Sequence, residues 1–73
     1  MGKLPRGVSG KDAVRVFEKV GFTFRNQTGS HVSLSRGTDR ISVPMHSSLA
    51  TGTLHSLIKQ ANLTIDEFND LLK

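Results

Sequence analysis

The spacing of the apolar residues changes twice along this 73-residue chain, and that change limits the possible folds more than any other feature. Near the N-terminus, four apolar residues recur with the period of one helical face: Ala13, Val16, Phe17 and Val20. Apolar and polar residues then alternate, as they do in half-buried strands. A helical period returns in the C-terminal third. The order of helix, strands and helices predicts an α+β fold.

The first helix is predicted over residues 10–20. Ser9 is a suitable N-cap, Asp12 can complete a capping box, and Gly21 is a typical helix stop. Residues 1–8 contain a proline, two glycines and two cations, a composition typical of an extended arm without regular structure.

Three short strands are predicted over residues 22–25, 30–35 and 41–43. In the middle strand, Val32 and Leu34 occupy one face and the polar residues occupy the other. Pro44 ends the third strand. Because proline is confined to strand ends and edges, the third strand is expected at an edge of the sheet.

A second helical stripe predicts a helix over residues 51–61, and Thr64 with Glu67 forms a capping box for a short final helix. The chain contains no repeat and no linker, so residues 1–73 are expected to form one domain. The helices should cover one face of a three-stranded antiparallel sheet and leave the other face polar.

The net charge of +4 is unevenly distributed, with a balance of +5 over residues 1–40 and −1 over residues 41–73. A basic N-terminal part suits a polyanionic partner, nucleic acid before a membrane surface, although surface cations also serve solubility. The chain has no cysteine, which excludes disulfides and thiolate chemistry. Without an apolar run that resembles a signal or spans a bilayer, we expect a cytoplasmic protein.

The register of the first two strands can be estimated, because opposed residues of an antiparallel pair share a face. Matching the apolar residues pairs Phe22 with Leu34 and Phe24 with Val32. That register places Arg25 opposite His31 after a short loop.

Two registers match the apolar residues of the second and third strands. One places His31 opposite His46. The other pairs Val32 with Val43 and moves His46 alongside Gly29. Both registers bring His46 to the end of the sheet that holds His31.

A row of Arg25, His31 and His46 suits phosphodiester chemistry. Imidazole changes its protonation state between roughly pH 5 and 8, so it can accept a proton from a ribose 2′-hydroxyl or donate one to the leaving 5′ oxygen. A guanidinium stabilises charge that develops on the phosphate oxygens. This chemistry requires no metal or other cofactor, and only RNA carries the internal nucleophile. His31 is the primary catalytic candidate and His46 the second.

Each candidate also has a simpler explanation. An exposed histidine on a strand, such as His31, is more often a solvated residue than a catalytic one. His46 can simply be the residue that ends a strand, and Arg25 can be a surface cation. We expect His55 at the surface or in contact with a phosphate, and no histidine pair has the helical spacing of a metal site. Ser30 lacks a Ser-His-acid arrangement, so a turn or backbone role is expected. Gly29 is expected to supply a positive φ and a close backbone approach.

Several short motifs follow one another in a specific order along nearly the whole chain: Leu4-Pro5, Ser9-Gly10-Lys11, Gly21-Phe22, Gly29-Ser30-His31, Val43-Pro44-Met45-His46, Gly52-Thr53-Leu54, Ile58-Lys59-Gln60-Ala61 and Glu67-Phe68. In these motifs the sequence resembles the HicA toxin family of bacterial toxin-antitoxin systems. The resemblance implies a fold like a double-stranded RNA-binding domain and an endoribonuclease that cleaves messenger RNA. Its essential histidine maps onto His31, with Gly29 and Ser30 as structural support. The sequence departs from the family at residues 6–8 and at His55, where the family often has a cation.

The resemblance also implies a HicB-type antitoxin that covers His31 and represses the operon. We expect the toxin alone to be monomeric and to form a hetero-oligomer with the antitoxin. RNA contacts are expected at Arg25 and at three N-terminal cations, Lys3, Arg6 and Lys11. The alternative function is a non-enzymatic RNA-binding module of the same fold.

Overall fold

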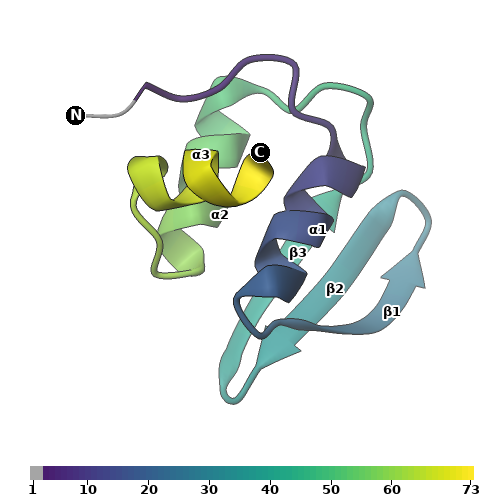
Figure 1. Cartoon of the computed structure of the whole chain (residues 1–73). Coiled ribbons are helices and arrows are strands. Elements are labelled where there is room, and N and C mark those ends of the chain that lie inside the picture. The colour runs from purple at the N-terminus through teal and green to yellow at the C-terminus, as the bar shows by residue number, and fades with distance from the viewer. Residues whose placement is uncertain (1–2) are drawn as a thin grey trace.

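The computed structural model describes residues 3–73 and contains the predicted elements in the predicted order (Figure 1). They are α1 (Gly10–Lys19), β1 (Thr23–Thr28), β2 (His31–Arg36), β3 (Asp39–Pro44), α2 (Thr51–Gln60) and α3 (Ile65–Leu72). Helices α1 and α2 each end one residue before the predicted end, whereas β1 continues to Thr28. Among the described residues, no helix is long and apolar enough to cross a membrane.

Both predicted capping boxes are present. The Ser9 hydroxyl accepts a hydrogen bond from the Asp12 backbone nitrogen at 3.0 Å, and the Asp12 carboxylate accepts one from the Ser9 nitrogen at 3.3 Å. Thr64 and Glu67 repeat the arrangement at 3.1 and 2.8 Å. Each box satisfies two donors that a helix N-terminus would otherwise leave without partners, which explains where α1 and α3 begin.

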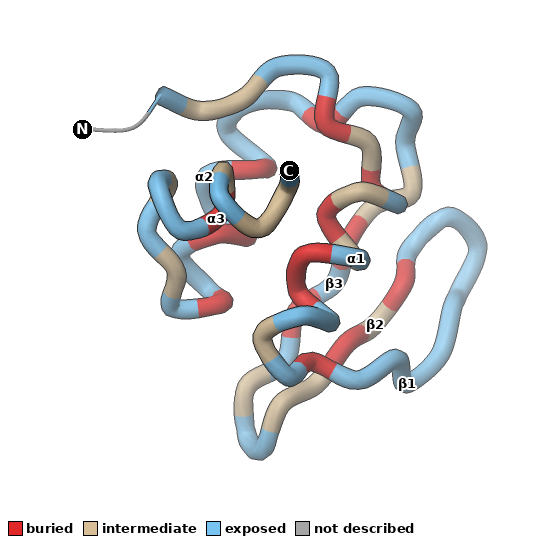
Figure 2. Tube along the Cα trace, in the orientation of Figure 1, coloured by how far each residue is buried: buried red, intermediate tan, exposed pale blue. Residues whose placement is uncertain are grey.

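The three helices meet the sheet in one apolar core (Figures 1 and 2). Phe17 of α1 is fully buried at its centre. Its ring centroid lies 6.1 Å from that of Phe22 and 5.8 Å from that of Phe68 in α3. The predicted helical and strand stripes are confirmed as core residues: Ala13, Val16, Val32, Leu34, Ile41, Val43, Leu54, Leu57, Ile58 and Ala61.

Arg36 joins the ends of two helices to the sheet, a role that the sequence pattern does not predict. Its guanidinium carbon lies 4.4 Å from the centroid of the Phe22 ring. Its nitrogens donate to the carbonyl oxygens of Val20 at 3.0 Å and Ala61 at 3.1 Å, and one of them lies 3.4 Å from the Asp39 carboxylate. Because Val20 is the C-cap residue of α1 and Ala61 is the C-cap residue of α2, Arg36 satisfies carbonyl groups that helix C-termini leave free.

Two-residue turns connect the strands, Gly29-Ser30 in the first hairpin and Gly37-Thr38 in the second. The φ angles of Gly29 and Gly37 are +58° and +60°, and glycine at the first central position fits a type II′ turn. The predicted positive φ of Gly29 is therefore confirmed. The predicted close backbone approach is wrong, because a Cβ atom added at Gly29 would meet nothing within 4 Å.

The register between β1 and β2 differs from the one that apolar matching predicts. Phe24 lies opposite Leu34 and not opposite Val32. All six residues of β1 are exposed, including Phe24 at 51%. Because β1 buries no apolar face, burial does not select its register, and the predicted match is wrong.

A β-bulge between Phe24 and Asn26 also separates two candidate site residues. After this irregularity, Thr28 is the residue opposite His31. The predicted pairing of Arg25 with His31 is therefore wrong, because the bulge adds a residue to β1 and the strand continues past its predicted end.

The register between β2 and β3 is the second of the two predicted ones, with Val32 opposite Val43. His31 lies opposite Pro44, so the register that placed His31 opposite His46 is wrong. The strand order β1-β2-β3 confirms the prediction that the third strand is an edge.

Residues 3–8 have no regular structure, as predicted, but they pack against the rest of the fold. Val8 is 3% exposed, and its carbonyl oxygen accepts a hydrogen bond from the Leu49 nitrogen at 2.7 Å. The Asn69 amide in α3 donates to the carbonyl oxygen of Lys3 at 3.0 Å. The first two residues of the predicted arm lie outside the described residues.

Candidate functional site

The face of the sheet that points away from the helices, called the polar face here, carries three rows of residues paired across the strands. The rows are Thr28–His31–Pro44, Asn26–Ser33–Ser42 and Thr23–Ser35–Arg40. Side chains two residues apart on one strand share a face, so neighbouring rows are roughly 7 Å apart. The middle row therefore separates His31 from Arg40.

His31 is exposed at one end of the polar face, as the first residue of β2. The turn at Gly29-Ser30 brings the chain back directly before it. Pairing with Thr28 on one side and Pro44 on the other fixes the backbone of His31 in the sheet. The sheet thus holds the backbone of His31 in place, while its imidazole stays exposed and accessible to a large ligand.

His46 is exposed two residues after β3, in a segment held at both sides. The Met45 nitrogen donates to the carbonyl oxygen of Ser30 at 2.6 Å, and the Gly10 nitrogen donates to the carbonyl oxygen of His46 at 2.9 Å. These contacts confirm the prediction that His46 comes to the end of the sheet that holds His31.

The N-terminus of α1 packs directly on the backbone that precedes His46. A Cβ atom at Gly10 would overlap the Pro44 carbonyl oxygen and lie 2.8 Å from the Met45 Cα atom. Glycine is therefore the residue that allows this contact. Lys11, the next residue, is exposed in the first turn of α1 and so belongs to the same end of the molecule.

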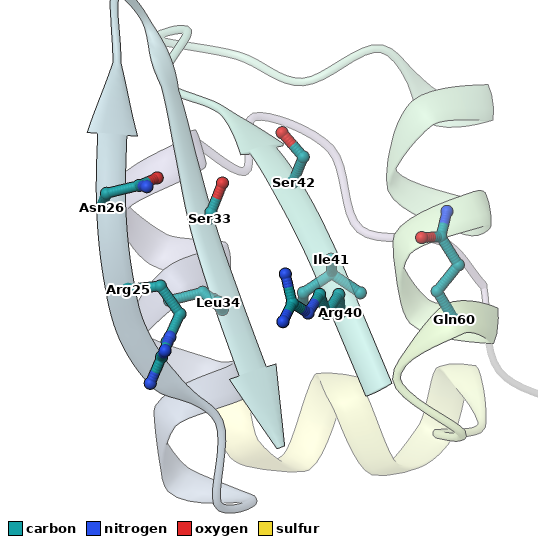
Figure 3. Close-up of a pocket in the computed structure, with 8 residues that line it drawn as sticks. All are labelled: Arg25, Asn26, Ser33, Leu34, Arg40, Ile41, Ser42 and Gln60. Atoms are coloured by element: carbon teal, nitrogen blue, oxygen red, sulfur yellow. The ribbon is translucent and has the colours of Figure 1, made fainter. Parts of the chain in front are cut away.

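A hollow of about 420 Å³ lies on the polar face beyond the His31 row (Figure 3). The residues that line it come from all three strands and α2: Arg25, Asn26, Ser33, Leu34, Arg40, Ile41, Ser42 and Gln60. Arg25 is the additional residue of the bulge between Phe24 and Asn26, and it lines the hollow together with Asn26. Arg25 therefore belongs to the hollow and not to a pair with His31.

None of the residues in the three rows of the polar face carries a carboxylate. Asp39 is the only acidic residue in the three strands, and it shares the helix-facing side with Arg36, to which it is bonded. Arg25 and Arg40 are exposed and have no acidic neighbour in these rows. A polyanion on this face would meet only cations and neutral hydrogen-bonding groups.

The other predicted residues lie outside these rows. Lys3 and Arg6 are exposed on the N-terminal segment, and His55 is exposed on α2. Ser30 lies in the two-residue turn between β1 and β2, which confirms the predicted turn position. Within residues 3–73, no three His, Asp or Glu side chains are grouped as a metal site would require.

Arg40 is the charged residue of the hollow that sequence reasoning missed, and the neutral residues Asn26, Ser33 and Ser42 were missed with it. The pattern predicts a polar turn over residues 36–40, so Arg40 receives no role. A signal was nevertheless available, because the alternation of Ile41 and Val43 also places Arg40 and Ser42 on the opposite, polar face.

A family model described as the HicA toxin of bacterial toxin-antitoxin matches residues 10–63. The chain belongs to the HicA toxin family. The match begins at Gly10, includes His31 and His46, and ends before α3. This HicA-family chain is accordingly the toxin component of a toxin-antitoxin pair. A comparison with curated proteins found no match.

Proposed function

We propose that this HicA-family toxin is an endoribonuclease that cleaves messenger RNA, with His31 as its essential residue. The observation that supports the proposal best is the position of His31, exposed at the end of a face that carries Arg25 and Arg40 and no carboxylate. An RNA backbone is a polyanion and is attracted to such a face.

The proposed reaction is an internal transesterification. The His31 imidazole accepts the proton of a ribose 2′-hydroxyl while the 2′ oxygen attacks the adjacent phosphorus. The bond from phosphorus to the 5′ oxygen breaks, and that oxygen takes up a proton. The products are a 2′,3′-cyclic phosphate and a 5′-hydroxyl. Protons move only among RNA, imidazole and water, so the scheme needs no metal or other cofactor.

His46 is the proposed donor of the proton to the leaving 5′ oxygen. It is exposed at the same end of the sheet as His31. The hydrogen bonds from Gly10 to His46 and from Met45 to Ser30 keep its backbone in a fixed position relative to the first hairpin. When His46 is removed, water supplies this proton less efficiently.

The proposed partner is a HicB-type antitoxin protein that neutralises the toxin by covering His31. A residue that is open to a polymer substrate is equally open to a protein surface. We propose that the toxin acts in the cytoplasm, is monomeric alone and forms a hetero-oligomer with the antitoxin.

The test is cleavage of messenger RNA in the presence of EDTA by wild type, His31→Ala and the matched control His55→Ala. We expect the His31 variant to lose at least about 100-fold in rate, and the His55 variant, altered at an exposed histidine on α2, to retain the wild-type rate. Cleavage by His31→Ala at the wild-type rate would show that the assignment is wrong.

The second candidate function, an RNA-binding module without catalysis, is favoured by the hollow with its two arginines. It predicts RNA affinity that decreases steeply with salt and no cleavage products under any condition. Products ending in a cyclic phosphate would exclude it.

A further inference from the structure

We propose that the hollow on the polar face binds one nucleotide of single-stranded RNA, next to the phosphodiester that His31 attacks. This inference rests on the proposed RNA cleavage and adds the residues that hold the substrate. The phosphate is assigned to Arg25 and Arg40, and the nucleoside to Asn26, Ser33 and Ser42.

The hollow is large enough for one small unit of a longer ligand, such as one nucleotide of an RNA strand. Its volume of about 420 Å³ lies within the range of roughly 300–1,000 Å³ that is typical of ligand pockets. Strands β1, β2 and β3 form its floor, and Gln60 at the end of α2 stands at its side (Figure 3). A single strand presents separate bases and phosphates to such a site, whereas a duplex keeps its bases stacked and paired.

The middle row supplies neutral hydrogen-bonding groups. Asn26, Ser33 and Ser42 lie directly opposite one another across the three strands. The amide and the two hydroxyls can each donate and accept hydrogen bonds, as the edge of a base or a ribose hydroxyl requires. The rows of the polar face contain no Phe, Tyr or Trp, so base recognition at the middle row depends on these groups and on guanidinium planes.

The two arginines supply the charge. Arg25 comes from β1 and Arg40 from β3, on either side of the central strand. Guanidinium groups bind phosphate oxygens through two parallel hydrogen bonds. Arg25 is the bulged residue of β1, and bulges often re-aim a side chain beside a functional site.

The order of the rows defines the position of the substrate. The middle row lies roughly 7 Å from the His31 row, comparable to the repeat of an extended RNA strand. A strand laid along β2 with one phosphodiester at His31 therefore has the next phosphate near the middle row, in the hollow that Arg25 and Arg40 line. The nucleoside between the two phosphates lies against the polar groups of the middle row.

The binding test uses a short fluorescein-labelled single-stranded RNA whose riboses are all 2′-O-methyl, which cannot be cleaved through a 2′-hydroxyl. Arg25→Gln and Arg40→Gln are each expected to weaken binding about tenfold. The slope of log affinity against log salt should decrease by about 0.7 for each phosphate that the protein no longer neutralises. Lys73→Gln, which removes an exposed cation at the end of α3, is the matched control and should bind as wild type does. Wild-type affinity in the double arginine variant would overturn the proposal.

The position of the held phosphate is tested with a set of the same RNAs, each carrying one uncharged methylphosphonate. We expect the substitution next to the bond that wild type cleaves in unmodified RNA of the same sequence to weaken binding to wild type and to have no effect on the double arginine variant. A decrease in affinity only at a distant phosphate would overturn the assignment.

The two proposals fail separately. If the arginine variants bind RNA normally while His31→Ala abolishes cleavage, the nucleotide site is wrong and the nuclease stands. If His31→Ala cleaves normally, the proposed nuclease residue is wrong whatever the arginines do. If the arginine variants bind RNA normally but no longer bind the purified antitoxin, the hollow is a contact surface for the protein partner, and the proposed nucleotide site is wrong.

Discussion

The backbone nitrogen of Gly10 donates a hydrogen bond of 2.9 Å to the carbonyl oxygen of His46, at a contact where no side chain fits on Gly10. The first residue of α1 thereby fixes the second candidate histidine, although the two are far apart in the sequence. The stability of the fold and the geometry of the site are coupled at this point.

Gly10→Ala is expected to lower the free energy of unfolding by about 1–3 kcal/mol, because the added methyl group overlaps the Pro44 carbonyl. Gly52→Ala is the matched control, since a Cβ atom at this exposed helical position meets nothing within 4 Å. It should leave stability unchanged or raise it by up to about 1 kcal/mol. Chemical denaturation of both variants measures the difference, and equal stability would contradict the close packing of α1 on β3.

At Gly29, the expected effect of a substitution on stability depends on the backbone conformation and not on the space around the residue. Because φ is +58° and the surroundings are open, Gly29→Ala should destabilise the protein by about 1 kcal/mol. Gly29→Asn should cost less, since asparagine tolerates this conformation better. Thermal unfolding distinguishes the two variants. If alanine and asparagine have equal effects, conformational strain is not the reason for glycine here.

Helix α3 lies outside the matched family region, yet Phe68 is fully buried against Phe17. Phe68→Ala should therefore lower the free energy of unfolding by about 3–5 kcal/mol. Asp66→Ala, on the exposed side of the same helix, is expected to change it by no more than about 1 kcal/mol. Urea denaturation tests both. A small effect at Phe68 would mean that α3 is an addition to the fold and not part of its core.

If His46 donates the proton to the leaving oxygen, the rate of RNA cleavage should have a bell-shaped dependence on pH. The descending limb arises when the acid loses its proton, so His46→Ala should remove that limb and leave the ascending one. His55→Ala should preserve both. A profile unchanged by His46→Ala would reduce His46 to a residue at the end of a strand.

The helices could be predicted because their signals are local. The apolar stripe around Phe17 and the capping box of Thr64 each lie within a few residues of sequence, and the structure confirms both. The polar orientation of His31 was predictable for the same reason, since Val32 and Leu34 fix the two faces of β2.

The surroundings of His31 could not be predicted, because they depend on a strand without a buried face. With all of β1 exposed, apolar matching gave the wrong partner for Phe24 and placed Arg25 beside His31. The bulge has no clear signal in the sequence. Arg36 was missed because its partners, the carbonyl groups of Val20 and Ala61, are brought together only by tertiary packing.

The most direct test of the central claim is single-turnover cleavage of DNA oligonucleotides that contain one ribonucleotide, used as a pool of mixed sequences. The proposed mechanism predicts cleavage only on the 3′ side of the ribonucleotide, a 2′,3′-cyclic phosphate at the new end, and loss of this activity in His31→Ala. Cleavage of the all-deoxy pool, or an unchanged rate in His31→Ala, would contradict it.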